Sequence, residues 1–205
     1  MTHEHIIFIP VIFFIGFILG KLSSTKNKHT SPSRKGLIIS LITFVSLFVS
    51  THIFPFFGGV KALSFVLYGM PIFDQRPSFS SFDVYQRLVD FGSEGREMYQ
   101  RFTYSADLVF PISFLIFLIM LSKFINERYQ PSKNWKKVFI TLPILWFFSD
   151  VIENVIVFKL LSIFPLENIF LGNVLGEVTV AKFFLLLMSI FAPAIFVIFY
   201  HRSND

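Results

Sequence analysis

The sequence predicts an all-α membrane protein, a bundle of five transmembrane helices in which an N-terminal helix joins a four-helix core. Of the 205 residues, 54% are hydrophobic and only 15% are charged, against about a quarter in soluble proteins. The apolar residues gather into long runs, and the basic residues gather between those runs. We therefore expect residues 1–205 to form a single transmembrane helical domain with an amphipathic helix on its external side.

The five expected spans differ in length. A helix needs about 20 apolar residues (range roughly 17–25) to cross the hydrocarbon core of a bilayer. The expected spans cover residues 6–21, 36–57, 105–125, 138–160 and 180–200. The first is the shortest, and a signal sequence is the alternative. Its leader, Met1 to His5, has no Lys or Arg, which favours a retained anchor.

Basic residues set the expected orientation, because short cytoplasmic loops carry an excess of Lys and Arg. The connection after the first run holds basic residues and no acid: Lys21, Lys26, Lys28, Arg34 and Lys35. The connection after the third run holds one acid, Glu127, against Lys123, Arg128, Lys133, Lys136 and Lys137. The other two connections are balanced in charge. We expect a cell membrane location with the N-terminus outside and the C-terminus in the cytoplasm.

The long external connection predicts an amphipathic helix over residues 80–104. Ser80 fits an N-cap, and Asp83 adds an acid to the first turn. The apolar face is expected to comprise Phe82, Tyr85, Leu88, Val89, Tyr99 and Phe102. The charged residues expected to point away from that face are Arg87, Asp90, Glu94, Glu97 and Arg101.

Glycines are expected to shape the external connections. Gly92 and Gly95 are expected to interrupt the amphipathic helix. The stretch 58–77 is rich in Gly and Pro and predicts an irregular loop associated with the membrane. Gly172 and Gly176 fit either a close helix contact or a tight turn.

Polar residues inside the fourth span indicate a site. Asp150, Glu153 and Asn154 would share one face of a helix. A charge in hydrocarbon costs roughly 2.5–3.5 kcal/mol even on a lenient scale, so such groups normally face a protein interior. A rise of about 1.5 Å per residue places the two acids in the external half of the span.

Two further charged residues are expected at the same level. Asp107 heads the third span and Lys182 opens the fifth, both on the external side. We expect them to join Asp150 and Glu153 in a polar pocket, because apolar pockets with a few converging polar groups are the usual form of a ligand site. The segment 81–104 would roof this pocket. Its candidate lid residues are Arg96 and Tyr99.

Structural roles are the alternative for the same residues. Asp150, Glu153 and Asn154 would then satisfy Lys182, hydroxyl groups or backbone in a network that fixes helix order. Asp107 would be no more than the cap of its helix, and Lys182 would extend to the membrane interface. His52 lies in the external half of the second span, away from that helix's other polar face, and the sequence leaves open which of the two faces the interior.

Several classes of function find no support. The chain has no Cys, which excludes disulfides and thiolate chemistry, and its scattered histidines do not predict a zinc site. We expect no nucleic acid, because topology explains the positions of the basic residues. We also expect no cofactor and no metal, with a carboxylate-bound hard cation as the open alternative. No nucleophile elbow, P-loop, dinucleotide fingerprint or HExxH is present, and whether a reaction is catalysed is left open.

One resemblance is based on two groups of residues. The order Gly92, Gly95-Arg96, Tyr99, Asp107 and Phe110-Pro111, followed by Asp150, Glu153 and Asn154, resembles a pattern in small multi-pass bacterial membrane proteins of unassigned function. The resemblance covers residues 36–200. It implies a compact helical bundle in the bacterial cytoplasmic membrane and no particular activity.

Three functions are consistent with these observations. The first is the binding or processing of a lipid or apolar small molecule at an acid-lined site in the external half of the bundle. The second is a non-catalytic assembly protein with a structural polar network, working as a homo-oligomer or with a membrane protein partner. A proton-coupled transporter ranks behind both, because 205 residues without an internal repeat leave little room for alternating access.

Overall fold

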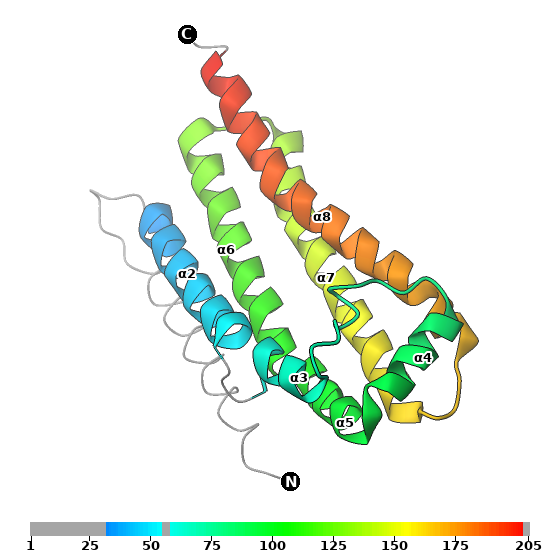
Figure 1. Cartoon of the computed structure of the whole chain (residues 1–205). Coiled ribbons are helices and arrows are strands. Elements are labelled where there is room, and N and C mark those ends of the chain that lie inside the picture. The colour runs from blue at the N-terminus through cyan, green and yellow to red at the C-terminus, as the bar shows by residue number, and fades with distance from the viewer. Residues whose placement is uncertain (1–31, 55–57, 203–205) are drawn as a thin grey trace. The chain divides into compact units, whose positions relative to one another are not determined.

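The computed structural model describes residues 32–54 and 58–202, and every regular element in these ranges is a helix (Figure 1). The long helices are α2 (Pro32–Phe48), α6 (Ala106–Tyr129), α7 (Lys133–Ile163) and α8 (Ile169–Arg202). The short ones are the π-helical turn η2 (Val49–Ile53), α3 (Val60–Val66), α4 (Ser81–Asp90) and α5 (Gly92–Thr103). The predicted all-helical class is confirmed for these residues.

Within residues 32–54 and 58–202, three helical segments are long and apolar enough to cross a membrane. They are Arg34–Ile53, which is α2 with η2, Gly92–Tyr129, which is α5 with α6, and Ile169–Tyr200 within α8. Many large apolar side chains on α8 are exposed, including Phe184, Ile198 and Phe199. Such faces are typical of helices that lipid surrounds. The first expected span, residues 6–21, lies outside the described residues.

The chain divides into two compact units, each built from several parts of the sequence. The first unit comprises residues 1–46, 112–147 and 184–205. Its described helix segments meet through aromatic side chains: the Phe44 and Phe114 ring centroids are 4.4 Å apart, and Phe139 and Phe196 are 5.5 Å apart. Ser122 donates a hydrogen bond to the backbone oxygen of Phe139 at 2.6 Å, which joins α6 to α7.

The second unit comprises residues 47–111 and 148–183 and has a continuous apolar core. The short helices α3, α4 and α5 pack there against the end of α7 and the start of α8. Fully buried side chains come from each of these elements: Leu63, Val84, Leu88, Tyr99, Phe102, Leu160 and Leu175. Burying apolar side chains of this size is worth about 1.5–3 kcal/mol each, so this core is the main stabilising feature of the unit.

The predicted amphipathic segment is two helices rather than one. Ser80 is the N-cap of α4 and accepts a hydrogen bond from the Asp83 backbone at 3.2 Å, as predicted. The break falls at Gly92, whose φ of 66° suits glycine. The predicted interruption at Gly95 is wrong, because Gly95 lies inside α5.

The predicted apolar face of this segment is divided in the structure. Phe82 is 79% exposed and Val89 is 56% exposed, whereas the other four members are buried. Arg87, expected to point away from this face, is buried as well, which corrects the prediction. Its long guanidinium side chain finds acceptors inside the unit, a possibility that spacing along a helix does not reveal.

Two connecting stretches are more regular than predicted. Residues 58–77, expected to be irregular, contain α3, and α8 begins at Ile169 rather than near residue 180. Gly172 and Gly176 therefore lie in a helix and not in a turn. A Cβ added at Gly176 would lie 2.6 Å from the Ser78 backbone oxygen, and one at Gly172 would lie 2.7 Å from Ser81 Cα. Both glycines allow α8 to approach the chain just before α4.

This close approach predicts the effect of Gly176→Ala. The new methyl group would meet backbone, which cannot move aside, so we expect a net loss of roughly 1–2 kcal/mol in the free energy of unfolding despite a helix-propensity gain of about 1 kcal/mol. Gly36→Ala in α2 is the matched control, since its Cβ would meet only the flexible Met120 sulfur at 3.3 Å. Thermal unfolding in detergent measures both. Equal stability of the two variants would contradict the contact.

Candidate functional site

The second unit buries an ion-pair cluster centred on the Lys182 ammonium group. Its Nζ lies 2.7 Å from Asp74 Oδ2 and 3.2 Å from Asp150 Oδ1, and it also contacts Glu153 Oε2. The Lys182 side chain is only 3% exposed, and Glu153 is fully buried. We call these four residues the lysine cluster. Each of the three acids places one oxygen within ion-pair distance of the ammonium group, and the contact with Asp74 is also a hydrogen bond.

Helix geometry brings three members of the cluster together. Asp150 and Glu153 are three residues apart on α7, so both project from the same face. Lys182 and Thr179 are likewise three residues apart on α8. The Thr179 hydroxyl group donates a hydrogen bond to Glu153 Oε1, so both carboxylate oxygens of Glu153 have a partner.

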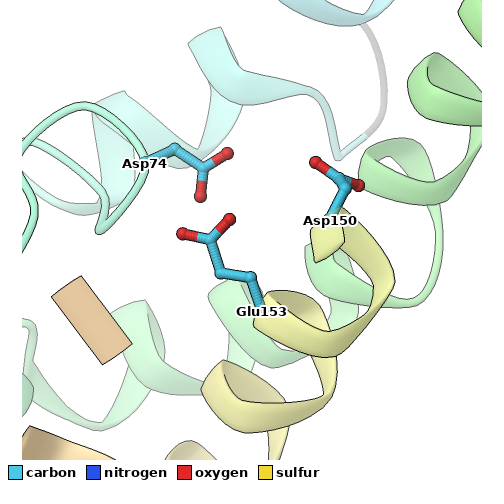
Figure 2. Close-up of side chains that lie close together, drawn as sticks. All are labelled: Asp74, Asp150 and Glu153. Carbon is cyan, nitrogen blue, oxygen red and sulfur yellow. The ribbon is translucent and has the colours of Figure 1, made fainter. Parts of the chain in front are cut away.

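The fourth member comes from a loop. Asp74 lies between α3 and α4, and Figure 2 shows its carboxyl group turned toward those of Asp150 and Glu153 on α7. Its side chain is 24% exposed, the largest value in the cluster. Asp74 is therefore the member through which solvent has access to the buried charges.

Arg87 holds this loop in place. Its guanidinium group donates hydrogen bonds to the backbone oxygens of Pro71 at 2.7 Å and Arg76 at 2.6 Å, and to Ser78 Oγ at 2.7 Å. It also lies 4.3 Å from the centroid of the Phe73 ring. Burial lowers the pKa of the Arg87 guanidinium group below its ordinary value, yet arginine stays protonated in proteins. These bonds fix the loop on both sides of Asp74.

Tyr99 supports the same loop through its contacts with Phe73. Its hydroxyl oxygen accepts a hydrogen bond from the Phe73 backbone N–H at 3.1 Å, and its ring stacks on Phe73 with centroids 5.9 Å apart. Tyr99 is 1% exposed. The predicted lid residue is thus a buried support for the residue next to Asp74, and it faces the protein interior.

The other two charged residues predicted for the site, Asp107 and Arg96, differ in their distance from the lysine cluster. Asp107 is half-buried in the first turn of α6, within electrostatic range of Asp74, Asp150 and Lys182. Arg96 lies away from the cluster: it donates to the Leu88 backbone oxygen at 2.7 Å and lies 4.1 Å from the centroid of the Phe164 ring.

The sequence did not predict the roles of Asp74, Arg87 and Thr179 in the site. Asp74 lies in an irregular loop, where no periodicity relates it to a helix face. Thr179 shares a helix face with Lys182, a relation that becomes visible only when α8 begins well before residue 180. Arg87 was predicted to point away from the apolar face of its helix, whereas the structure buries it.

The cluster has the ligand types of a hard-cation site. Oxygen atoms of Asp74, Asp150 and Glu153 lie within 4.8 Å of one another, and carboxylate oxygens are the ligands that Ca²⁺ and Mg²⁺ prefer. However, the Lys182 ammonium group already contacts one oxygen of each acid. The lysine supplies the positive charge that a metal ion would bring, so the arrangement fits an internal ion-pair network.

A groove lies beside the cluster on α7. It has a volume of about 360 Å³ and is formed by the end of α5, the start of α6 and α7. Its lining residues are Thr103, Tyr104, Leu108, Val151, Asn154, Val155 and Phe158. Almost all of its surface is apolar. Asn154, one of the polar lining residues, is 5% exposed, and its Nδ2 has no hydrogen-bond partner among the described residues.

His52 does not join the cluster. Its Nδ1 lies 2.8 Å from the Thr51 hydroxyl oxygen in η2, and its ring contacts Phe48 and Phe110 at centroid distances of 4.6 and 5.1 Å. It is half-buried among aromatic rings, and Thr51 is the more deeply buried of the two.

No family model matches this chain, and no curated protein or solved structure is significantly similar to it. The resemblance to small multi-pass bacterial membrane proteins therefore stays a prediction from the sequence.

The lysine cluster predicts a large effect of Lys182→Met. The change keeps much of the side chain's volume but leaves three acids without their counter-charge, which typically costs 3–5 kcal/mol. Thermal unfolding in detergent should show this loss, and adding Glu153→Gln should recover part of it. Lys123→Met, at an exposed position, is the control. A Lys182→Met variant as stable as the control would refute the ion-pair network.

The Arg87 contacts predict a local effect of Arg87→Lys. An ammonium group cannot reach three acceptors arranged around a planar guanidinium group, so the loop that presents Asp74 should loosen. Hydrogen exchange of residues 71–78 should accelerate by about tenfold or more, which corresponds to the loss of about 1.4 kcal/mol of local stability. Arg76→Lys, whose side chain is largely exposed, should leave this exchange unchanged.

Proposed function

We propose that this chain is a multi-pass integral membrane protein that binds a lipid or an apolar small molecule in the groove beside the lysine cluster. The groove carries the proposal: it has apolar walls, a volume within the range of ligand sites, and one buried polar group without a partner. No reaction is proposed, since no group in the groove is arranged as a nucleophile or base.

The proposed topology has five spans with the N-terminus outside and the C-terminus in the cytoplasm. Three segments that are long and apolar enough support it. In this topology α7 is a further span: its 31 residues would extend about 46 Å, more than the roughly 30 Å of the hydrocarbon core. The basic residues Lys133, Lys136 and Lys137 at its start then lie in the cytoplasm.

In this proposal the groove and the cluster have different tasks. The lysine cluster ties α7, α8 and the loop around Asp74 together, and its three acids are occupied by Lys182. Asp150 and Glu153 therefore position the groove wall, and the ligand contacts come from the next face of α7. Among Asp150, Glu153 and Asn154, only Asn154 lines the groove, and its Nδ2 has no hydrogen-bond partner among the described residues.

An assembly protein with a purely structural network is the second candidate. The observation that favours it is that Lys182 finds all of its ionic partners within this chain. In that case the groove would hold no ligand, and the purified protein would carry a membrane protein partner in fixed stoichiometry. Native mass spectrometry distinguishes the two candidates directly.

Ligand binding in the groove predicts different effects of two tryptophan substitutions on α7. Val155→Trp should fill the groove and remove co-purifying lipid or small molecule, as measured by native mass spectrometry from a mild detergent. Ile152→Trp is the control, because Ile152 is 52% exposed and does not line the groove. Both changes replace exposed side chains, so both variants should fold. Retention of the same ligand by Val155→Trp would place binding elsewhere.

A further inference from the structure

Asn154, which lines the groove, carries a hydrogen-bond donor whose partner is missing. Its Nδ2 is buried behind the apolar surface of the groove and has no acceptor among residues 32–54 and 58–202. A buried polar group left unpaired carries a desolvation penalty, and the great majority of such groups in proteins are paired. A ligand that brings an acceptor to this position would remove the penalty.

Two other lining residues carry hydroxyl groups, Thr103 and Tyr104. The Thr103 hydroxyl group already donates its proton to the Gln100 backbone oxygen at 2.8 Å, and Tyr104 is 46% exposed, so neither is a buried donor without a partner. The remaining wall is apolar, including Leu108, Val151 and Phe158. The groove therefore suits a molecule with an apolar body and one acceptor oxygen, and it has no carboxylate to pair with a cationic head group.

The depth of the groove in the membrane indicates which chemical group could bring this acceptor oxygen. Asn154 is 16 residues beyond Val138, the start of the apolar run of α7, so it lies about 24 Å along the helix. The hydrocarbon core is about 30 Å thick, which puts Asn154 near its outer boundary. In a glycerolipid bilayer, the ester carbonyl groups mark that boundary. The groove is also open at its side, because Val155 is 61% and Tyr104 46% exposed.

From these observations we propose that the groove binds one acyl chain of an outer-leaflet glycerolipid, whose ester carbonyl oxygen accepts a hydrogen bond from Asn154 Nδ2. This inference rests on the proposed function, and it adds the chemical class of the ligand and the atom that recognises it. The acyl chain covers the apolar wall, and the lipid head group lies outside the groove.

Ester and ether lipids test this directly, because an ether lipid has the same chains and head group but no carbonyl. The full-length protein in nanodiscs of mixed dioleoyl phosphatidylcholine and its diether analogue is transferred to detergent, and retained lipid is measured by native mass spectrometry. We expect the diester lipid to exceed the diether by about three- to tenfold, as one hydrogen bond supplies. Asn154→Leu should abolish this preference while both lipids are still retained.

The outcomes separate this inference from the proposed function. Equal retention of diester and diether lipid by the unmodified protein overturns the role of Asn154 and leaves groove binding intact. Retention of neither lipid overturns both proposals. A diester preference that persists in Asn154→Leu also overturns the inference, because another group would then read the carbonyl. The comparison in the unmodified protein holds even if the variant fails to fold.

Discussion

The second unit depends on one buried ammonium group and three carboxylates. Lys182 joins α8 to Asp150 and Glu153 on α7 and to Asp74 in the loop before α4. Buried ions are expensive, and removing one partner leaves the others uncompensated. This makes the arrangement specific, because few alternative registers of α7 against α8 would place both acids of α7 beside Lys182, together with Asp74 from the loop. The network therefore fixes the geometry of the second unit as well as contributing to its stability.

The other features of this unit keep that network in place. Arg87 and Tyr99 use ordinary hydrogen bonds to hold the loop on both sides of Asp74. Gly172 and Gly176 let α8 lie directly against the start of α4 and the chain before it. Lys182 is less than two helical turns beyond Gly176. The apolar core between α3, α4, α5 and the ends of α7 and α8 completes the unit. Polar contacts decide its register, and apolar burial supplies most of its stability.

The site separates two tasks over one helical turn of α7. Glu153 contacts Lys182 with one carboxylate oxygen and accepts a hydrogen bond from Thr179 with the other, whereas its neighbour Asn154 lines the groove and has an unpaired donor. A rigid wall with few hydrogen-bonding groups suits binding better than proton transfer or catalysis. In the proposed function, the charged residues therefore position the groove wall and the Asn154 amide recognises the ligand.

The amino-acid sequence was enough to predict the helical class and three members of the cluster, Asp150, Glu153 and Lys182, because the cost of charge in an apolar run singles such residues out. It also indicated the serine N-cap of α4, which is a local signal. The other features of the site depend on contacts between elements that are distant in the sequence. Asp74 and Thr179 reach the cluster, Arg87 turns inward and Arg96 turns away because each finds its partner on another element. Periodicity reports which face of a helix a residue occupies, and only packing decides what that face meets.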